Sequence, residues 1–258
     1  ELWIKVYGDE FKTKMQFRDL GCGNGVLVYI LISEGIKGYG IDARHRKSWS
    51  IFPQETKTCL KEQVIIPSIL LRPHPDMKKQ YPQLEHNGRL FPMKVAHEYI
   101  APATIVYSSE DLLKSPQVNI AEFPRDTFVI GNHSDEMTCW IPLLGYPFMI
   151  IPCCSHNLGG QRTRFNVRKG IANGVNGNSS YAGLVDHVED LAEQLGWKVE
   201  KEMLRIPSTR NAAIISYENP EIGKFPTQKT YDVLQAEGGA ESWIQNTMAL
   251  MRGHPRSH

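Results

Sequence analysis

The fold is decided by the stretch Asp19-Leu20-Gly21-Cys22-Gly23-Asn24-Gly25. A short apolar run over 15–20 precedes the glycines and an apolar stretch over 26–32 follows them, which is the order strand, glycine turn, helix. Residues 38–41 then predict a second strand, which closes on Asp42. A β-α-β unit of this kind belongs to a parallel sheet, and the ligands of such sheets bind beyond the carboxyl ends of the strands.

The spacing of the glycines indicates the ligand. Glycine lacks a Cβ atom, so strictly alternating glycines let the backbone turn sharply and approach a cofactor. A dinucleotide site instead uses the spacing G-x-G-x-x-G against a pyrophosphate, which the carboxylate of Asp19 would repel. Asp19 suits the cationic part of S-adenosylmethionine (SAM), and Asp42 is placed to accept hydrogen bonds from ribose hydroxyls. A dinucleotide site and a purely structural glycine turn remain the alternatives. The predicted SAM site comprises Asp19, Gly21, Gly23, Asn24, Gly25 and Asp42.

Later segments extend the same pattern. Residues 103–107, 127–130 and 148–151 are short, β-prone and bounded by turn residues, and they predict strands three, four and five. Residues 181–195 show helical periodicity, and 197–203 with 212–217 predict a closing pair of strands. The predicted fold class is α/β, with a mostly parallel central sheet and helices on both faces. Asp19 to Gly25 and Asp42 resemble the first two cofactor motifs of the Rossmann-like class I SAM-dependent methyltransferases, which implies that fold.

The domain organisation follows from length and composition. A chain of 258 residues with 41% hydrophobic residues is long enough for one full core, so 1–258 predicts a single domain. Residues around 59–100 are irregular and rich in Pro, His and Lys, which indicates an insertion or long loop. Residues around 166–180 are rich in Gly, Asn and Ser, which predicts a mobile loop.

Charge and cysteine content limit the partners. The net charge is +1 with 22% charged residues, so an RNA partner would require a local basic patch. Five cysteines without regular spacing favour a reducing compartment. No run approaches the roughly 18 to 20 apolar residues that cross a bilayer. We therefore expect a cytoplasmic protein with no membrane association and no evident obligatory protein partner.

Three further segments carry a resemblance to a family. They are Ile-Asp-Ala-Arg-His-Arg-Lys-Ser-Trp at 41–49, Ile-Gly-Asn-His-Ser-Asp-Glu-Met-Thr at 130–138 and Ile-Pro-Cys-Cys-Ser-His at 151–156. With the glycine motif, they resemble the eukaryotic tRNA (uracil-44 2'-O)-methyltransferase family over about 17–165. This resemblance implies methyl transfer from SAM to the ribose 2'-hydroxyl of the uridine at position 44 of serine tRNA.

The segment after the fourth strand holds the catalytic candidates. A ribose hydroxyl is a weak nucleophile, so a base must take its proton or polar groups must align it with the methyl group. We predict Asp135 or His133 in this role, with Asn132 beside the cofactor. The alternatives are that 134–136 caps the following helix, and that transfer proceeds by positioning alone.

Cys153-Cys154-Ser155-His156 contains three potential zinc ligands. Neighbouring side chains on an extended strand point to opposite faces, so a zinc site would need ligands from elsewhere. We therefore predict no metal, with the cysteines as packing residues and His156 facing the substrate RNA.

Two basic clusters are expected at the ligand edge. One follows the second strand and the other follows the fifth, and phosphate contacts from them would hold tRNA. A solvated surface is the alternative for each cluster. The clusters contain Arg44, Arg46 and Lys47, and Arg162, Arg164, Arg168 and Lys169.

Two other functions are compatible with these patterns. A SAM-dependent enzyme acting on a protein or a small molecule would have a closed acceptor pocket. A non-catalytic SAM-binding scaffold subunit would have a blocked acceptor face.

Overall fold

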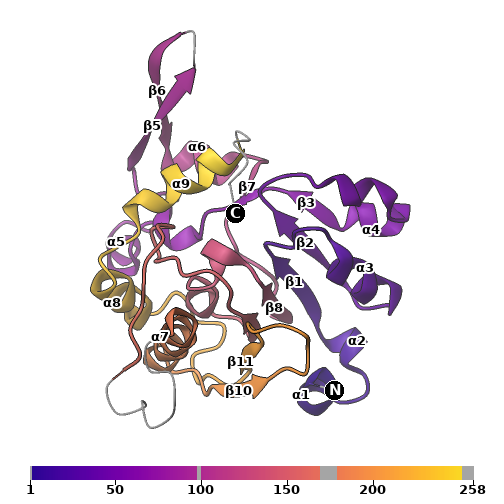
Figure 1. The fold of residues 1–258 in the computed structure, drawn as a ribbon. Coiled ribbons are helices and arrows are strands. Elements are labelled where there is room, and N and C mark those ends of the chain that lie inside the picture. Colours follow the sequence, from indigo (N-terminus) through magenta and orange to yellow (C-terminus); the bar gives the residue numbers. More distant parts are fainter. Residues whose placement is uncertain (1, 98–99, 169–178, 252–258) are drawn as a thin grey trace.

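The computed structural model describes residues 2–97, 100–168 and 179–251 (Figure 1). Its centre is a seven-stranded sheet in the order β10-β11-β9-β8-β1-β2-β3. Neighbouring strands are parallel, except that β11 runs antiparallel to both β9 and β10. This arrangement confirms the mostly parallel α/β sheet and the predicted closing pair. The strands are β1 (Gln16–Leu20), β2 (Gly38–Asp42), β3 (Leu60–Glu62), β8 (Thr127–Asn132), β9 (Phe148–Ile151), β10 (Glu200–Met203) and β11 (Ala212–Ser216).

The first β-α-β unit forms as the sequence predicts. The glycine loop joins β1 to helix α3 (Val26–Ser33), and Gly25 begins the helix with a left-handed φ of 78°. Strand β2 then pairs in parallel with β1, where Asp19 faces Gly40 in the register. The glycine loop and the end of β2 therefore meet at the carboxyl edge of the sheet.

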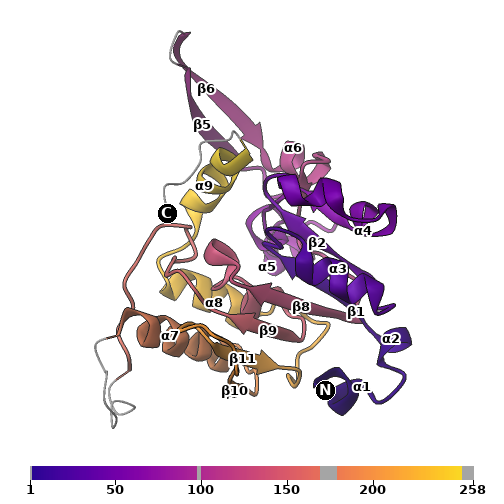
Figure 2. The ribbon, with the colours of Figure 1, turned by 45° about the vertical axis from the view of Figure 1, so that its right-hand side comes forward.

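Helices cover both faces of the sheet, as expected (Figure 2). Each face of the sheet has its own hydrophobic core. Successive side chains along β8 point to opposite faces, so Phe128 and Ile130 pack in one core while Val129 packs in the other. The first side holds α1 (Leu2–Tyr7), α2 (Phe11–Lys14) and α3. The second holds α7 (Ser180–Gln194) and α8 (Gln228–Ala236), and α7 confirms the helix predicted over 181–195.

The prediction for the third strand was wrong. The sheet's third strand is β3, which pairs with β2. Residues 103–107 belong instead to β6 (Ile100–Ser108), which forms a separate antiparallel hairpin with β5 (Leu90–His97). This hairpin projects from the body (Figures 1 and 2). A three-residue strand gives almost no periodic signal, whereas the longer β6 does, so the pattern identified a strand but assigned it to the wrong sheet.

The segment around 59–100 is built of short elements. It holds β3, β4 (Val64–Ile65), η2 (Ser68–Leu70), α5 (Pro75–Gln80) and β5, and β4 pairs with β7 (Val118–Asn119). The helix that the sequence predicts after the fourth strand is not formed in the described residues 135–144, which hold two short 3-10 turns instead. The remaining elements are α4 (Gln54–Thr58), α6 (Ser109–Lys114), η1 (Lys47–Ile51), η3 (Asp135–Met137), η4 (Ile141–Leu144) and α9 (Glu241–Met251).

The expected mobile loop and the absence of a membrane span are assessed only on the described residues. Residues 169–178 of the expected loop around 166–180 lie outside the described residues. In the described part of the chain, every helix is too short or too polar to span a membrane.

Candidate functional site

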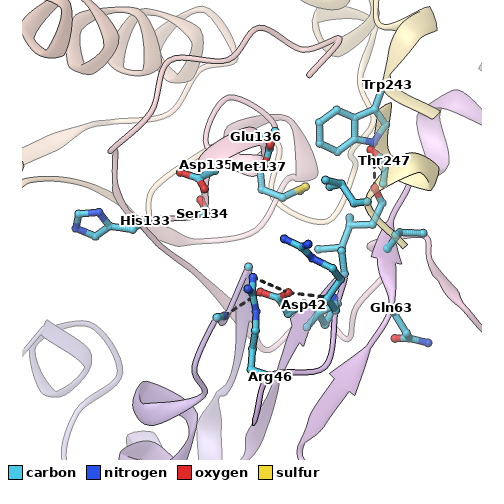
Figure 3. A pocket seen from close by; sticks show the side chains of 18 residues that line it. Asp42, Arg46, Gln63, His133, Ser134, Asp135, Glu136, Met137, Trp243 and Thr247 are labelled. Carbon is cyan, nitrogen blue, oxygen red and sulfur yellow. Dashed lines mark hydrogen bonds and ion pairs between the residues drawn. The ribbon is translucent and has the colours of Figure 1, made fainter. Parts of the chain in front are cut away.

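A cavity of about 200 Å³ opens at the carboxyl edge of the sheet, beyond β1, β2 and β8. Figure 3 shows Asp42 and Arg46 on one side of it, the loop after β8 on another, and Trp243 and Thr247 on a third. Residues from five separate parts of the sequence therefore share one cavity. Its lining comprises Gly21, Gly23, Ile41–Arg44, Arg46, Gln63–Ile65, His133–Met137, Trp243, Thr247 and Leu250.

The glycine loop leaves room for a ligand. Gly21 and Gly23 adopt positive φ values of 74° and 53°, a region that side chains disfavour. A Cβ atom on Gly23 would meet no atom nearer than 4.0 Å, so it would occupy open space at the cavity. A Cβ atom on Gly21 would lie 3.2 Å from the Cα atom of Ser134, so glycine there lets the β1 and β8 loops meet.

Asp42 ties the second strand to this loop. One carboxylate oxygen accepts the backbone N–H of Gly23 at 3.0 Å. The other accepts the backbone N–H of Arg44 at 3.1 Å and lies 3.3 Å from the Arg46 guanidinium. A carboxylate offers about four acceptor positions. One position therefore remains for a ligand hydroxyl, and the half-exposed Arg46 is able to move aside.

Asp19 lies behind the loop rather than in the cavity lining. Its side chain is 2% exposed, and its Oδ1 atom has no hydrogen-bond partner within the described residues. Burial, helped by the neighbouring charge of Asp42, raises the pKa of Asp19 to about 7. A ligand cation in the cavity would therefore act on Asp19 through the electric field rather than by direct contact.

The loop after β8 is held in a strained conformation. His133 and Asp135 have positive φ values of 56° and 45°, and residues with a Cβ adopt such values at a cost of about 1 to 3 kcal/mol each. The backbone N–H of His133 donates to the carbonyl of Ile151 at 3.1 Å, which fixes the loop to the end of β9. Ser134 stands before η3 but makes no side-chain capping hydrogen bond. This geometry favours a site over the alternative of a helix cap.

Helix α9 supplies residues that sequence reasoning missed. Trp243 Nε1 donates to the carbonyl of Ile65 at 3.0 Å and so fastens the helix over β4. Thr247 lines the cavity, is 4% exposed, and its hydroxyl has no hydrogen-bond partner among the described residues. Such a hydroxyl is suited to a polar ligand edge. The buried side chains Trp243, Ile244, Thr247 and Met248 follow helical spacing, which predicts the helix but not its place over the cavity.

The predicted cofactor residues divide into two groups. Gly21, Gly23 and Asp42 line the cavity, as do both catalytic candidates, His133 and Asp135. The others lie outside the lining. Asn24 precedes α3, and its Oδ1 atom accepts the backbone N–H of Val26 at 3.0 Å. Asn132 is exposed at the end of β8, Gly25 begins α3, and Asp19 is buried.

The residues predicted to contact RNA also differ in their surroundings. Arg44 and Arg46 line the cavity, and Arg162 and Arg164 are exposed on the segment after β9. His156 is only 4% exposed, with Nε2 3.9 Å from a Glu136 oxygen, so the prediction that it faces RNA is not supported. Burial also lowers the pKa of His156.

Arg168 has a structural role. Its guanidinium bonds to Asp186 at 2.9 Å, Asp190 at 2.8 Å and Glu193 at 2.9 Å, all on α7. These carboxylates compete with any phosphate for the same donors. The remaining member of the cluster, Lys169, lies outside the described residues.

Comparisons with known proteins agree with this arrangement. Residues 1–67 match a family model described as a predicted AdoMet-dependent methyltransferase, AdoMet being SAM. The curated relatives include proteins named tRNA (uracil-O(2)-)-methyltransferase from three yeasts. All of this chain aligns with each of them. Identity is 71% to the Saccharomyces cerevisiae protein, 69% to that of Kluyveromyces lactis and 34% to that of Schizosaccharomyces pombe.

These alignments cover 47%, 48% and 47% of the three relatives. The chain therefore spans about half the length of the curated relatives it matches. The search of solved structures found no match.

Proposed function

Because the chain belongs to the family of tRNA (uracil-O(2)-)-methyltransferases, we propose that it transfers a methyl group from SAM to the ribose 2'-hydroxyl of a uridine in tRNA. The observation that carries this proposal is the convergence of the glycine loop, Asp42 and the strained 133–135 loop on one cavity. The resemblance of 130–138 and 151–156 supports the finer proposal that the target is the uridine at position 44 of serine tRNA.

The cavity fits SAM on its own chemistry. Gly21 and Gly23 provide a surface without side chains, the spare acceptor position of Asp42 suits a ribose hydroxyl, and the unpartnered Thr247 hydroxyl suits a polar base edge. When bound, SAM supplies a methyl group activated by its sulfonium. The protein's part is to hold the acceptor hydroxyl in line with that methyl group.

The loop after β8 is the proposed acceptor side. His133 and Asp135 come from the same turn and line the same cavity as Asp42 (Figure 3). Either side chain has the chemistry to accept the hydroxyl proton as the oxygen attacks. The strained backbone fixes their positions, which is what alignment of a weak nucleophile requires.

Replacement of Asp42 by Ala is expected to weaken SAM binding by roughly 10- to 150-fold, since loss of a charged hydrogen-bond partner costs about 1.5 to 3 kcal/mol. Calorimetric titration with SAM measures this effect. Glu62→Ala is the matched control, because Glu62 ends the next strand, opposite Asp42 in the register, and is exposed outside the cavity lining. Equal SAM affinity in both variants would remove Asp42 from the site.

Replacement of Arg162 and Arg164 by Gln is expected to weaken tRNA binding and to reduce the salt dependence of the affinity. The log–log slope should fall by up to about 1.4 to 1.8, because each phosphate that a side chain neutralises adds about 0.7 to 0.9 to it. SAM affinity should not change. Lys37 and Lys224, which are exposed and lie outside this segment, provide the control pair. If both double variants keep the original slope, tRNA phosphates bind elsewhere.

The proposed function itself is tested by mapping methylated nucleotides after incubation of a tRNA pool with SAM that carries a labelled methyl group. We expect 2'-O-methyluridine at position 44 of serine tRNA. Label on a base or at another nucleotide would contradict the proposed target. Label on protein or on a small molecule would indicate the other class of SAM-dependent enzyme, and SAM binding without any transfer would indicate a scaffold.

A further inference from the structure

Three potential metal ligands converge beside the cavity, from the loops that follow β8 and β9. They are the carboxylate of Asp135 and the thiols of Cys153 and Cys154, whose ligand atoms all lie within 4.8 Å of one another. The Sγ atom of Cys153 donates to Asp135 Oδ1 at 2.8 Å. Among the described residues, no other group of three such side chains gathers in this way.

The backbone explains why sequence alone argued against a metal here. Adjacent side chains diverge on an extended strand, but β9 ends at Ile151 and the chain bends at Cys154. Both sulfur atoms therefore reach one place. The left-handed φ of Asp135, 45°, brings the missing ligand from the neighbouring loop. The requirement for a ligand from elsewhere in the sequence is met by Asp135.

We propose that Asp135, Cys153 and Cys154 bind a Zn²⁺ ion. Two thiolates select a borderline-soft ion such as zinc over magnesium or calcium, which prefer oxygen ligands. Zinc–sulfur bonds of about 2.3 Å and zinc–oxygen bonds of about 2.0 to 2.2 Å place tetrahedral ligand atoms roughly 3.5 to 3.8 Å apart. The most distant ligand atoms, within 4.8 Å of one another, would move closer, whereas Cys153 Sγ and Asp135 Oδ1, now 2.8 Å apart with the thiol proton between them, would separate as the ion replaces that proton.

The charges around the site are compatible with zinc. Two thiolates and a carboxylate exceed the charge of the ion by one, and the guanidinium of Arg210, whose Nη1 atom lies 3.8 Å from Cys154 Sγ, compensates for it. Three protein ligands with a fourth position open is the pattern of catalytic rather than structural zinc. Asp135 lines the cavity, so the open position would lie at the cavity wall (Figure 3).

This site does not depend on the proposed function, because it rests on the three ligands alone. It does bear on the acceptor side. A carboxylate that binds zinc is no longer free to take a proton, so zinc at Asp135 would leave His133 as the candidate base.

The test is zinc content and affinity of the purified chain. After incubation with Zn²⁺ and removal of the unbound ion, we expect one zinc per chain by atomic emission. Co²⁺ in place of zinc should give the near-ultraviolet absorption band of cobalt–thiolate bonds. Affinity is measured by competition with a chromophoric chelator.

Cys153→Ser, Cys154→Ser and Asp135→Asn should each weaken zinc binding by more than the roughly 10- to 100-fold that follows loss of an outer-shell partner. Cys59→Ser is the matched control, since Cys59 is a partly buried cysteine before β3 and should bind zinc as the parent does. Thermal unfolding of each variant shows that it is folded. Absence of zinc and of the cobalt band in the folded parent, or equal zinc affinity in all four variants, would overturn the proposal. So would mass spectrometry that finds Cys153 and Cys154 joined in a disulfide after reduction and zinc loading.

Discussion

If Asp135 is the base, Asp135→Asn is expected to preserve the fold and the SAM affinity while lowering the single-turnover methylation rate by about 10²- to 10⁴-fold, the usual contribution of a positioned acid or base. Asparagine is the suitable replacement, because it tolerates the left-handed backbone that Asp135 adopts better than most residues do. Its amide oxygen also keeps an acceptor for the Cys153 thiol.

His133→Asn tests the neighbouring candidate under the same backbone constraint, since φ is 56° at this position. Asp126→Asn, at the opposite end of β8 and exposed, is the control for the substitution itself. If both loop variants keep near-normal rates but unfold at lower temperature, the loop is structural and the catalytic assignment is wrong.

Removal of zinc with a chelator distinguishes the two possible roles of Asp135, which are zinc ligand and general base. If Asp135 acts only as a zinc ligand, removal of zinc from the parent protein should lower the rate as far as Asp135→Asn does, and the variant should then lose nothing more. If Asp135 is itself the base, the parent without zinc should keep its rate and Asp135→Asn should still lose it.

Asp19→Asn is expected to stabilise the protein above neutral pH. The pKa of Asp19 is raised from 3.8 to about 7, so between these values the folded protein holds a proton that the unfolded chain has released. The free energy of unfolding of the parent should therefore fall as the pH rises from about 4 to 7, by up to roughly 4 kcal/mol, and stay low above that. The variant should lack this fall. Urea unfolding at several pH values measures it.

The same substitution should cost SAM affinity. A cationic ligand favours the ionised carboxylate, so the parent's affinity should rise between pH 6 and 8 by more than that of Asp19→Asn. Protonation of SAM itself is common to both proteins and cancels in the comparison. Parallel stability curves for the two proteins would show that Asp19 is already ionised in the folded state at low pH.

The sequence predicts the local parts of this fold well. Strict glycine alternation and the two acids identify β1, α3 and β2, because these signals lie within about 25 residues and depend on backbone geometry. The prediction of the third strand was wrong, because β3 has only three residues and its pairing with β2 depends on contacts between separate segments. Periodicity reports that a segment is a strand, not which strand it joins.

In the candidate site, too, local signals were predictable and long-range contacts were not. His133 and Asp135 are predictable from their position after a strand, since the carboxyl edge is where this fold presents ligands. The place of helix α9 over the cavity and the meeting of Asp135 with Cys153 are not predictable, because they depend on contacts between distant segments. Arg168 illustrates the reverse error. A cluster of positive residues suggested RNA, whereas its guanidinium is bound by three carboxylates of α7.

The bond from Trp243 to Ile65 joins residues 178 positions apart, so one wall of the cavity is made by a segment that is synthesised long after the glycine loop. When the amino-terminal segments fold first, the sheet is able to assemble before α9 emerges. Competence to bind the cofactor would then be gained only after α9 has packed against the sheet. Side-chain contacts rather than strand pairing attach α9 to the rest of the fold, so the helix is able to open without global unfolding and its amide hydrogens should exchange early. Bound SAM should slow the exchange of α9 amides more than that of β1 or β8.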